Sequence, residues 1–179
     1  LTFFAVFVAG IAYLITRKSK WDKLGAACAE VGMVFTTIVM VTGSIWAKPI
    51  WNTWWAWGDP RLMSVMVLWL MYAAYFILRS SLPDGDKKYK FSAVFGIIAF
   101  LDVPIVWMSI RWWRTIHPVV ITSSGAELAA EMLHALMVSL IAMTVLCVTL
   151  VALRTAQRLN SSLADEVFQQ LDQERVSRQ

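Results

Sequence analysis

Tryptophan is concentrated in one short segment of this chain. Five of its ten tryptophans lie between Trp46 and Trp57. Grouped indole rings form a flat, polarisable surface, which suits a large planar apolar ligand such as a porphyrin, a quinone or a sterol. The alternative is an aromatic belt, whose rings lie at the depth of the lipid headgroups. Because a belt needs only a ring or two at each helix end, the segment predicts a ligand platform that includes Trp51, Trp54, Trp55 and Trp57.

Polar side chains directly follow these tryptophans. Arg61 could bind an anionic ligand edge, since a planar guanidinium pairs with a carboxylate through two hydrogen bonds. Asp59 could orient such a ligand, and it is nearly as well suited to cap a helix that begins near Leu62. Gly58 and Pro60 are expected to fix the turn that leads into this helix.

The only two histidines are the candidate metal ligands. His117 follows Trp112 and Trp113, and imidazole is a common axial ligand of haem iron. The aromatic neighbours make a ligand role for His117 about as well supported as a purely structural one. His134 lies near the start of the last apolar run, where a histidine is expected to cap the helix or to reach the membrane surface.

Two acids lie inside apolar runs. Asp102 precedes Pro104 by two residues, and two interpretations are equally supported. The carboxylate either belongs to a functional network, as intramembrane acids usually do, or satisfies backbone groups that the proline leaves unpaired. Glu30 lies near the start of its run, so it is expected to reach water by snorkelling.

The elements that must position these residues are membrane helices. Apolar residues make up 59% of the 179 residues and charged residues only 16%, which excludes a small water-soluble domain and a disordered chain. An unbroken apolar run in lipid must be helical, because its backbone polar groups need internal partners. The sequence therefore predicts an all-α, polytopic transmembrane helix bundle. Its five visible spans are 1–16, 25–46, 62–78, 93–110 and 132–152.

The basic residues predict how the chain is oriented. Twelve of the sixteen Lys and Arg residues fall in alternate connections, on one side of the predicted membrane. The positive-inside rule assigns that side to the cytoplasm, and the short clusters argue against nucleic-acid binding. Residues 1–153 are expected to form the transmembrane domain, with outer loops at 47–61 and 111–131. Residues 154–179 are expected to form a cytoplasmic C-terminal tail.

The first apolar run is slightly short for a full span, and the chain begins at Leu1 rather than at a methionine. We interpret the sequence as an N-terminally truncated part of a six-span protein. No motif for nucleotide hydrolysis, zinc-dependent hydrolysis or a catalytic triad is present in the sequence. Binding is therefore favoured over catalysis.

Two blocks of the sequence together resemble a known family. The run from Val41 to Leu62 is similar to the tryptophan-rich signature of the WWD-motif haem-handling proteins of cytochrome c biogenesis, and among them to the haem exporter protein C (CcmC) branch. The run from Asp102 to His117 is similar to the segment that carries a haem-ligand histidine in that family. Gly58 departs from the pattern, because it separates Trp57 from Asp59.

The resemblance implies a protein of the bacterial inner membrane that holds haem b at its outer face. It implies transfer of the haem to a periplasmic haem chaperone, alongside an ABC-type ATPase and a second membrane subunit. By matching position, His117 would be one axial ligand of the iron. The haem platform would consist of Trp51, Trp54, Trp55, Trp57, Asp59 and Arg61.

Two other functions are compatible with the same residues. A haem lyase of the cytochrome c synthase type would use this site to attach haem covalently, although such an enzyme would need further outer structure to receive its substrate. A haem-free structural subunit of a transporter complex would use the tryptophans only as an interfacial anchor.

Overall fold

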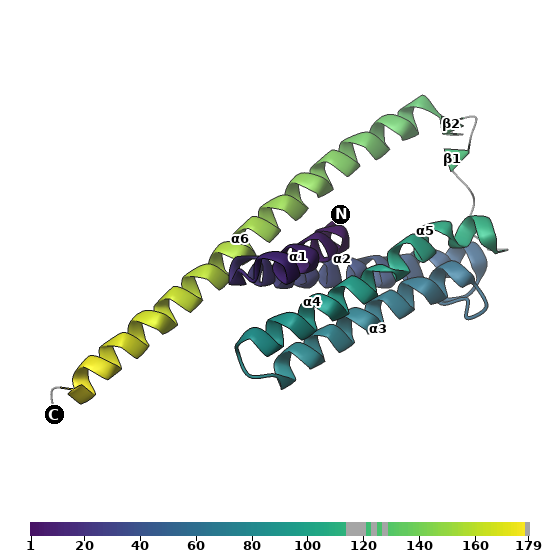
Figure 1. Ribbon diagram of the computed structural model, residues 1–179. Coiled ribbons are helices and arrows are strands. Elements are labelled where there is room, and N and C mark those ends of the chain that lie inside the picture. The colour runs from purple at the N-terminus through teal and green to yellow at the C-terminus, as the bar shows by residue number, and fades with distance from the viewer. Residues whose placement is uncertain (114–120, 123–124, 127–128, 178–179) are drawn as a thin grey trace.

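The computed structural model describes residues 1–113, 121–122, 125–126 and 129–177. Helices account for nearly all of these residues, as predicted for a polytopic bundle (Figure 1). The strands β1 (Ile121–Thr122) and β2 (Gly125–Ala126), of two residues each, pair antiparallel and are the exception within the described part of the chain. The helices are α1 (Thr2–Thr16), α2 (Ser19–Trp51), α3 (Pro60–Ser81), α4 (Asp86–Phe100), α5 (Asp102–Trp112) and α6 (Ala130–Ser177).

Several of these helices are long and apolar enough to cross a membrane. Among the described residues they are four: Ser19–Trp51, Pro60–Ser81, Asp86–Ser109 and Ala130–Asp165. The third combines α4 with most of α5, because only Leu101 separates the two helices and its backbone is itself in the right-handed helical region. The helix α1 is apolar but shorter, with 15 residues.

The helices α1 to α5 pack into one bundle. α1 lies against α2 and α4, and α3 lies against α4 and α5 (Figure 1). Small residues let the backbones approach closely, as is common between membrane helices. A side-chain carbon added at Gly32 of α2 would lie 2.5 Å from the ring of Phe3, so this contact with α1 requires glycine.

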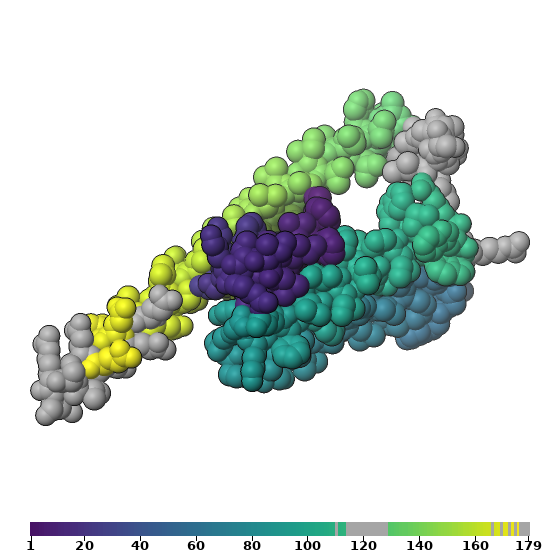
Figure 2. All heavy atoms as spheres, in the orientation of Figure 1, coloured from purple at the N-terminus to yellow at the C-terminus, as the bar shows by residue number. Residues whose placement is uncertain are grey.

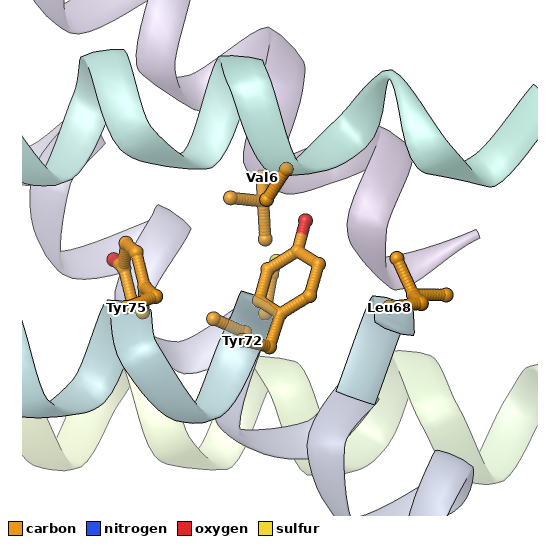
Figure 3. Close-up of a cluster of buried hydrophobic side chains, with 7 residues drawn as sticks. Val6, Leu68, Tyr72 and Tyr75 are labelled. Atoms are coloured by element: carbon orange, nitrogen blue, oxygen red, sulfur yellow. The ribbon is translucent and has the colours of Figure 1, made fainter. Parts of the chain in front are cut away.

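The core of the bundle lies between α1, α2, α3 and α4. Tyr72 of α3 is fully buried there, and its ring stacks on Phe3 with 4.0 Å between the ring centroids. Val6, Leu68 and Tyr75 surround it (Figure 3). Close van der Waals packing of this kind is a main force that holds helices together in lipid.

α6 is only partly attached to the bundle. It contacts α2 over part of its length, while its apolar first half lies almost fully exposed (Figures 1 and 2). The same helix continues through the residues predicted as a C-terminal tail and ends at Ser177.

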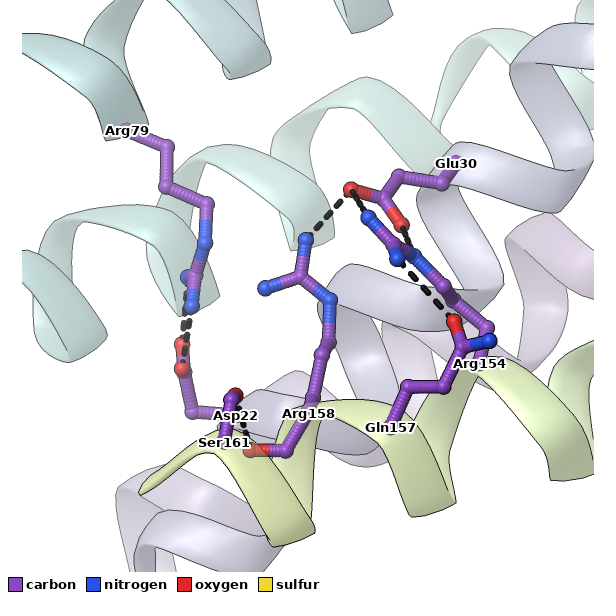
Figure 4. A network of polar contacts seen from close by, with 7 residues as sticks. All are labelled: Asp22, Glu30, Arg79, Arg154, Gln157, Arg158 and Ser161. Atoms are coloured by element: carbon purple, nitrogen blue, oxygen red, sulfur yellow. Dashed lines mark hydrogen bonds and ion pairs between the residues drawn. The ribbon is translucent and has the colours of Figure 1, made fainter. Parts of the chain in front are cut away.

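Polar contacts in the first half of α2 join this helix to α3 and α6. Arg79 of α3 donates two hydrogen bonds to Asp22, at 2.6 and 2.5 Å, and both side chains are nearly buried (Figure 4). Further along α2, Glu30 pairs with Arg154 and Arg158 of α6. Two guanidinium groups thus hold the Glu30 carboxylate, whose side chain is 27% exposed, and its access to water by snorkelling stays a prediction.

Candidate functional site

The tryptophan-rich segment surrounds a cavity of about 260 Å³ at one end of the bundle. The end of α2, the connection to α3 and the first turns of α3 form most of its wall, and Val106 of α5 adds to it. The lining is mostly apolar. It includes Met40, Gly43, Ser44, Ala47, Trp51, Trp54, Trp55, Arg61, Leu62 and Val65.

α2 extends further into this segment than predicted. The loop was expected to begin at residue 47, but the helix continues to Trp51, and Asn52 ends it in a left-handed conformation. Pro49 lies in this last turn, where it lacks the backbone N–H that would donate to the carbonyl of Ile45. As a result, Trp46 and Trp51 lie on one helix, with their rings edge to face at 5.2 Å between centroids.

The connection after Asn52 brings two more tryptophans to the cavity. Trp54 is 58% exposed, and the Lys48 ammonium lies 6.0 Å from the centroid of its ring. Trp55 is half-buried, and its Nε1 is a buried donor without an acceptor among the described residues. A buried N–H that lacks a partner is costly, so this donor marks a position where a bound acceptor would be favourable.

Trp57 lies apart from the other tryptophans of the predicted platform. It is 72% exposed and does not line the cavity. It occupies a turn with Gly58 that is closed by a hydrogen bond of 3.0 Å from the backbone N–H of Asp59 to the carbonyl of Ala56. Gly58 does not have a left-handed backbone, so the turn does not depend on a glycine at this position.

Asp59 is the N-cap of α3. Its Oδ1 accepts hydrogen bonds from the backbone N–H groups of Arg61 and Leu62, both at 3.1 Å, and the residue is only 4% exposed. Pro60 takes the first helical position, where no backbone donor is required. The capping role considered from the sequence is confirmed, and the cap fixes the position of Arg61 on the cavity wall.

We expect Asp59→Ala to lower the free energy of unfolding by about 1 kcal/mol, because two backbone donors of α3 lose their acceptor. Asp59→Asn keeps a capping oxygen and is expected to stay close to wild type. Thermal unfolding of the purified protein in detergent measures both effects. If both variants lower the free energy of unfolding equally, the carboxylate charge and not the capping hydrogen bonds stabilises the start of α3.

The second block of interest ends at the same end of the bundle. On α5, Cζ of Arg111 lies over the Trp107 ring, 4.6 Å from the ring centroid. The rings of Trp112 and Trp113 lie edge to face. α5 packs against α3, and its Val106 belongs to the wall of the tryptophan-lined cavity. His117 itself falls outside the described residues.

The other candidates lie away from the cavity. His134 is exposed on the first turns of α6. Asp102 is buried at the start of α5, and its Oδ2 has no hydrogen-bond partner among the described residues. This oxygen therefore satisfies no backbone group of the described residues near Pro104, so it gives no support to the interpretation that the carboxylate serves the backbone there.

Sequence reasoning missed the wall that α2 contributes. Met40, Gly43, Ala47 and Trp51 recur at intervals of three or four residues, which is the spacing of one helix face. That spacing was available in the sequence. The predicted helix ends at residue 46, however, so only Met40 and Gly43 of this face lie within it.

The fold and the site together define a polytopic helical membrane protein with a tryptophan-lined cavity at one end of its bundle. The family model described as "Heme exporter protein C" matches residues 1–168. The chain belongs to this family, whose proteins take part in cytochrome c maturation.

Individual relatives agree with this assignment. Heme exporter protein C of Bradyrhizobium diazoefficiens is 35% identical over 145 residues, which cover 80% of this chain and 55% of the relative. The Escherichia coli K12 protein of the same name is 36% identical over 110 residues, covering 62% of this chain and 44% of that protein. A ccmC-like mitochondrial protein of cytochrome c biosynthesis from Marchantia polymorpha is 31% identical over 134 residues, covering 74% and 56% respectively. The chain thus spans about half the length of these relatives.

Proposed function

We propose that this protein binds haem b at the tryptophan-lined cavity and presents it at the outer face of the bacterial inner membrane. The observation that carries the proposal is that Trp51, Trp54, Trp55 and Arg61 line one cavity. The family name adds support, because it describes the export of haem.

The residues of the cavity fit the chemistry of haem. Indole faces suit a planar macrocycle, and haem also carries two propionate groups. The unpartnered Nε1 of Trp55 and the guanidinium of Arg61 are donors that a propionate could accept from. When bound, haem would supply an iron centre that takes an axial protein ligand. His117 is our candidate for that ligand, and Asp59 would act indirectly by holding Arg61 in position.

The shape of the site supports delivery rather than storage. The cavity volume of about 260 Å³ is below the range of pockets that enclose a drug-sized ligand. Trp46 and Trp54 are both more than half exposed. A ligand held on such a surface stays accessible to a second protein. We therefore propose that haem passes from this site to a periplasmic haem chaperone, and that an ABC-type ATPase and a second membrane subunit assist the transfer.

The test is to purify the full chain in mild detergent from haem-replete cells and to measure its haem-to-protein ratio and Soret absorption. We expect bound haem that can be extracted without breaking a covalent bond. His117→Ala is expected to lower the ratio and shift the Soret band, since the iron loses a ligand, whereas His134→Ala serves as the matched control. Absence of haem from the wild type would favour a structural subunit, and attachment of haem to a co-expressed apocytochrome would favour a lyase.

A further inference from the structure

A second hollow lies between α2 and α6, apart from the tryptophan-lined cavity. It has a volume of about 750 Å³, and Phe76 of α3 adds to its wall. We call it the α2–α6 groove. Most of its lining is aliphatic or aromatic, including Val34, Ile38, Leu146 and Leu150. Its polar residues are Glu30, Arg154 and Gln157.

The polar residues gather at one end of the groove. On α6 they follow Leu153, which comes directly after the apolar run 132–152, and on α2 Glu30 precedes the apolar lining. From Arg154 to Leu146 the helix rises about 12 Å. One leaflet of the hydrocarbon core is about 15 Å thick. The groove is therefore nearly as deep as one leaflet. Like a leaflet, it is polar at one end and apolar along the rest. Its polar end lies on the side of the basic connections.

The polar end carries an excess of positive charge. Glu30 is paired with both Arg154 and Arg158, so two guanidinium groups share one carboxylate (Figure 4). Arg154 also donates to Gln157 Oε1 at 3.1 Å. These bonds use only part of the N–H groups of Arg154, and the Arg154 side chain remains 46% exposed. The remaining donors can reach a further anion.

We propose that the α2–α6 groove binds an anionic phospholipid of the leaflet that faces the basic connections. Its acyl chain lies along Ile38, Leu146 and Leu150, and its phosphate binds the exposed part of the Arg154 guanidinium. The excess charge selects an anionic headgroup over a zwitterionic one. This site is separate from the tryptophan-lined cavity, so it stands independently of the proposed function.

The test measures lipid binding to the purified full chain by native mass spectrometry. The two probes are dioleoyl phosphatidylglycerol and dioleoyl phosphatidylcholine, which share their acyl chains. We expect the wild type to prefer phosphatidylglycerol by about fivefold, the effect of one additional basic charge near a membrane surface. Arg154→Gln is expected to abolish the preference. Glu30→Gln is expected to increase it, because the carboxylate no longer competes with the headgroup.

The opposite signs of these two effects separate lipid binding from damage to the fold, which would weaken binding in both variants. Arg175→Gln removes a charge from the far end of the same helix and should leave the preference unchanged. Leu150→Trp fills the groove and should reduce phosphatidylglycerol binding without affecting inorganic phosphate. Equal binding of the two lipids by the wild type would overturn the proposal. A polypeptide helix that copurifies in the groove and excludes lipid would also overturn it.

Discussion

Arg79→Met is expected to lower the free energy of unfolding by about 3 to 5 kcal/mol, the largest stability change that we anticipate for a single replacement. Arg79 and Asp22 hold each other through two hydrogen bonds, with side-chain exposures of 10% and 3%. Methionine fills much of the same volume but leaves the Asp22 carboxylate buried and unpaired. The penalty therefore comes from the remaining charge and not from a cavity.

Thermal or denaturant unfolding in detergent measures this effect, and two comparisons make it specific. Lys88→Met removes a partner of Asp84, whose side chain is 82% exposed and can be solvated by water instead, and should cost at most about 1 kcal/mol. The double variant Asp22→Leu, Arg79→Met removes both charges and should recover most of the lost stability. If the double variant is as unstable as Arg79→Met, packing and not the unpaired carboxylate controls the stability of this contact.

Replacing Trp51 and Trp55 together with alanine is expected to reduce haem affinity about a hundredfold or more. Both side chains line the cavity, and each loses the burial of a large aromatic surface against the ligand, worth about 1.5 kcal/mol or more. The replacement of Trp55 also removes the unpartnered Nε1 donor. Titration of the purified protein with haem, followed by Soret absorption, measures the change.

Trp57→Ala is the matched control for this variant. Trp57 belongs to the same tryptophan-rich segment but lies outside the cavity and is 72% exposed, so we expect little change in affinity. A loss with Trp57→Ala as large as that of the double variant would show that haem lies across the whole segment. The cavity would then not be its binding site.

The sequence was sufficient to predict the elements that cross the membrane, because the physical requirement is local. Each apolar run must form a helix, and the runs at 62–78 and 132–152 lie within α3 and α6. The N-cap at Asp59 could also be predicted, since a cap depends only on the residues next to it. Helix ends were less predictable. Neither the extension of α2 to Trp51 nor that of α6 to Ser177 follows from hydropathy.

Contacts between helices could not be predicted from the sequence. Asp22 and Arg79 are 57 residues apart, and Glu30 and Arg154 are 124 residues apart. Which acid meets which base depends on the relative height and rotation of the helices. Side-chain packing over the whole bundle determines both. The same limit applies to the cavity. Its tryptophans and the helical spacing from Met40 to Ala47 are both visible in the sequence, but that this face of α2 turns toward the tryptophans depends on the rotation of the helix.

The 48 residues of α6 form a single helix, and this has a mechanical consequence. Beyond Arg154 the helix continues for roughly 35 Å at 1.5 Å per residue. A continuous helix is stiff, in contrast to a flexible linker. The helix is held to α2 at two places, by the ion pairs at Glu30 and by the hydrogen bond from Lys23 to Ser162, so its far end extends from α2 as a continuation of the same helix.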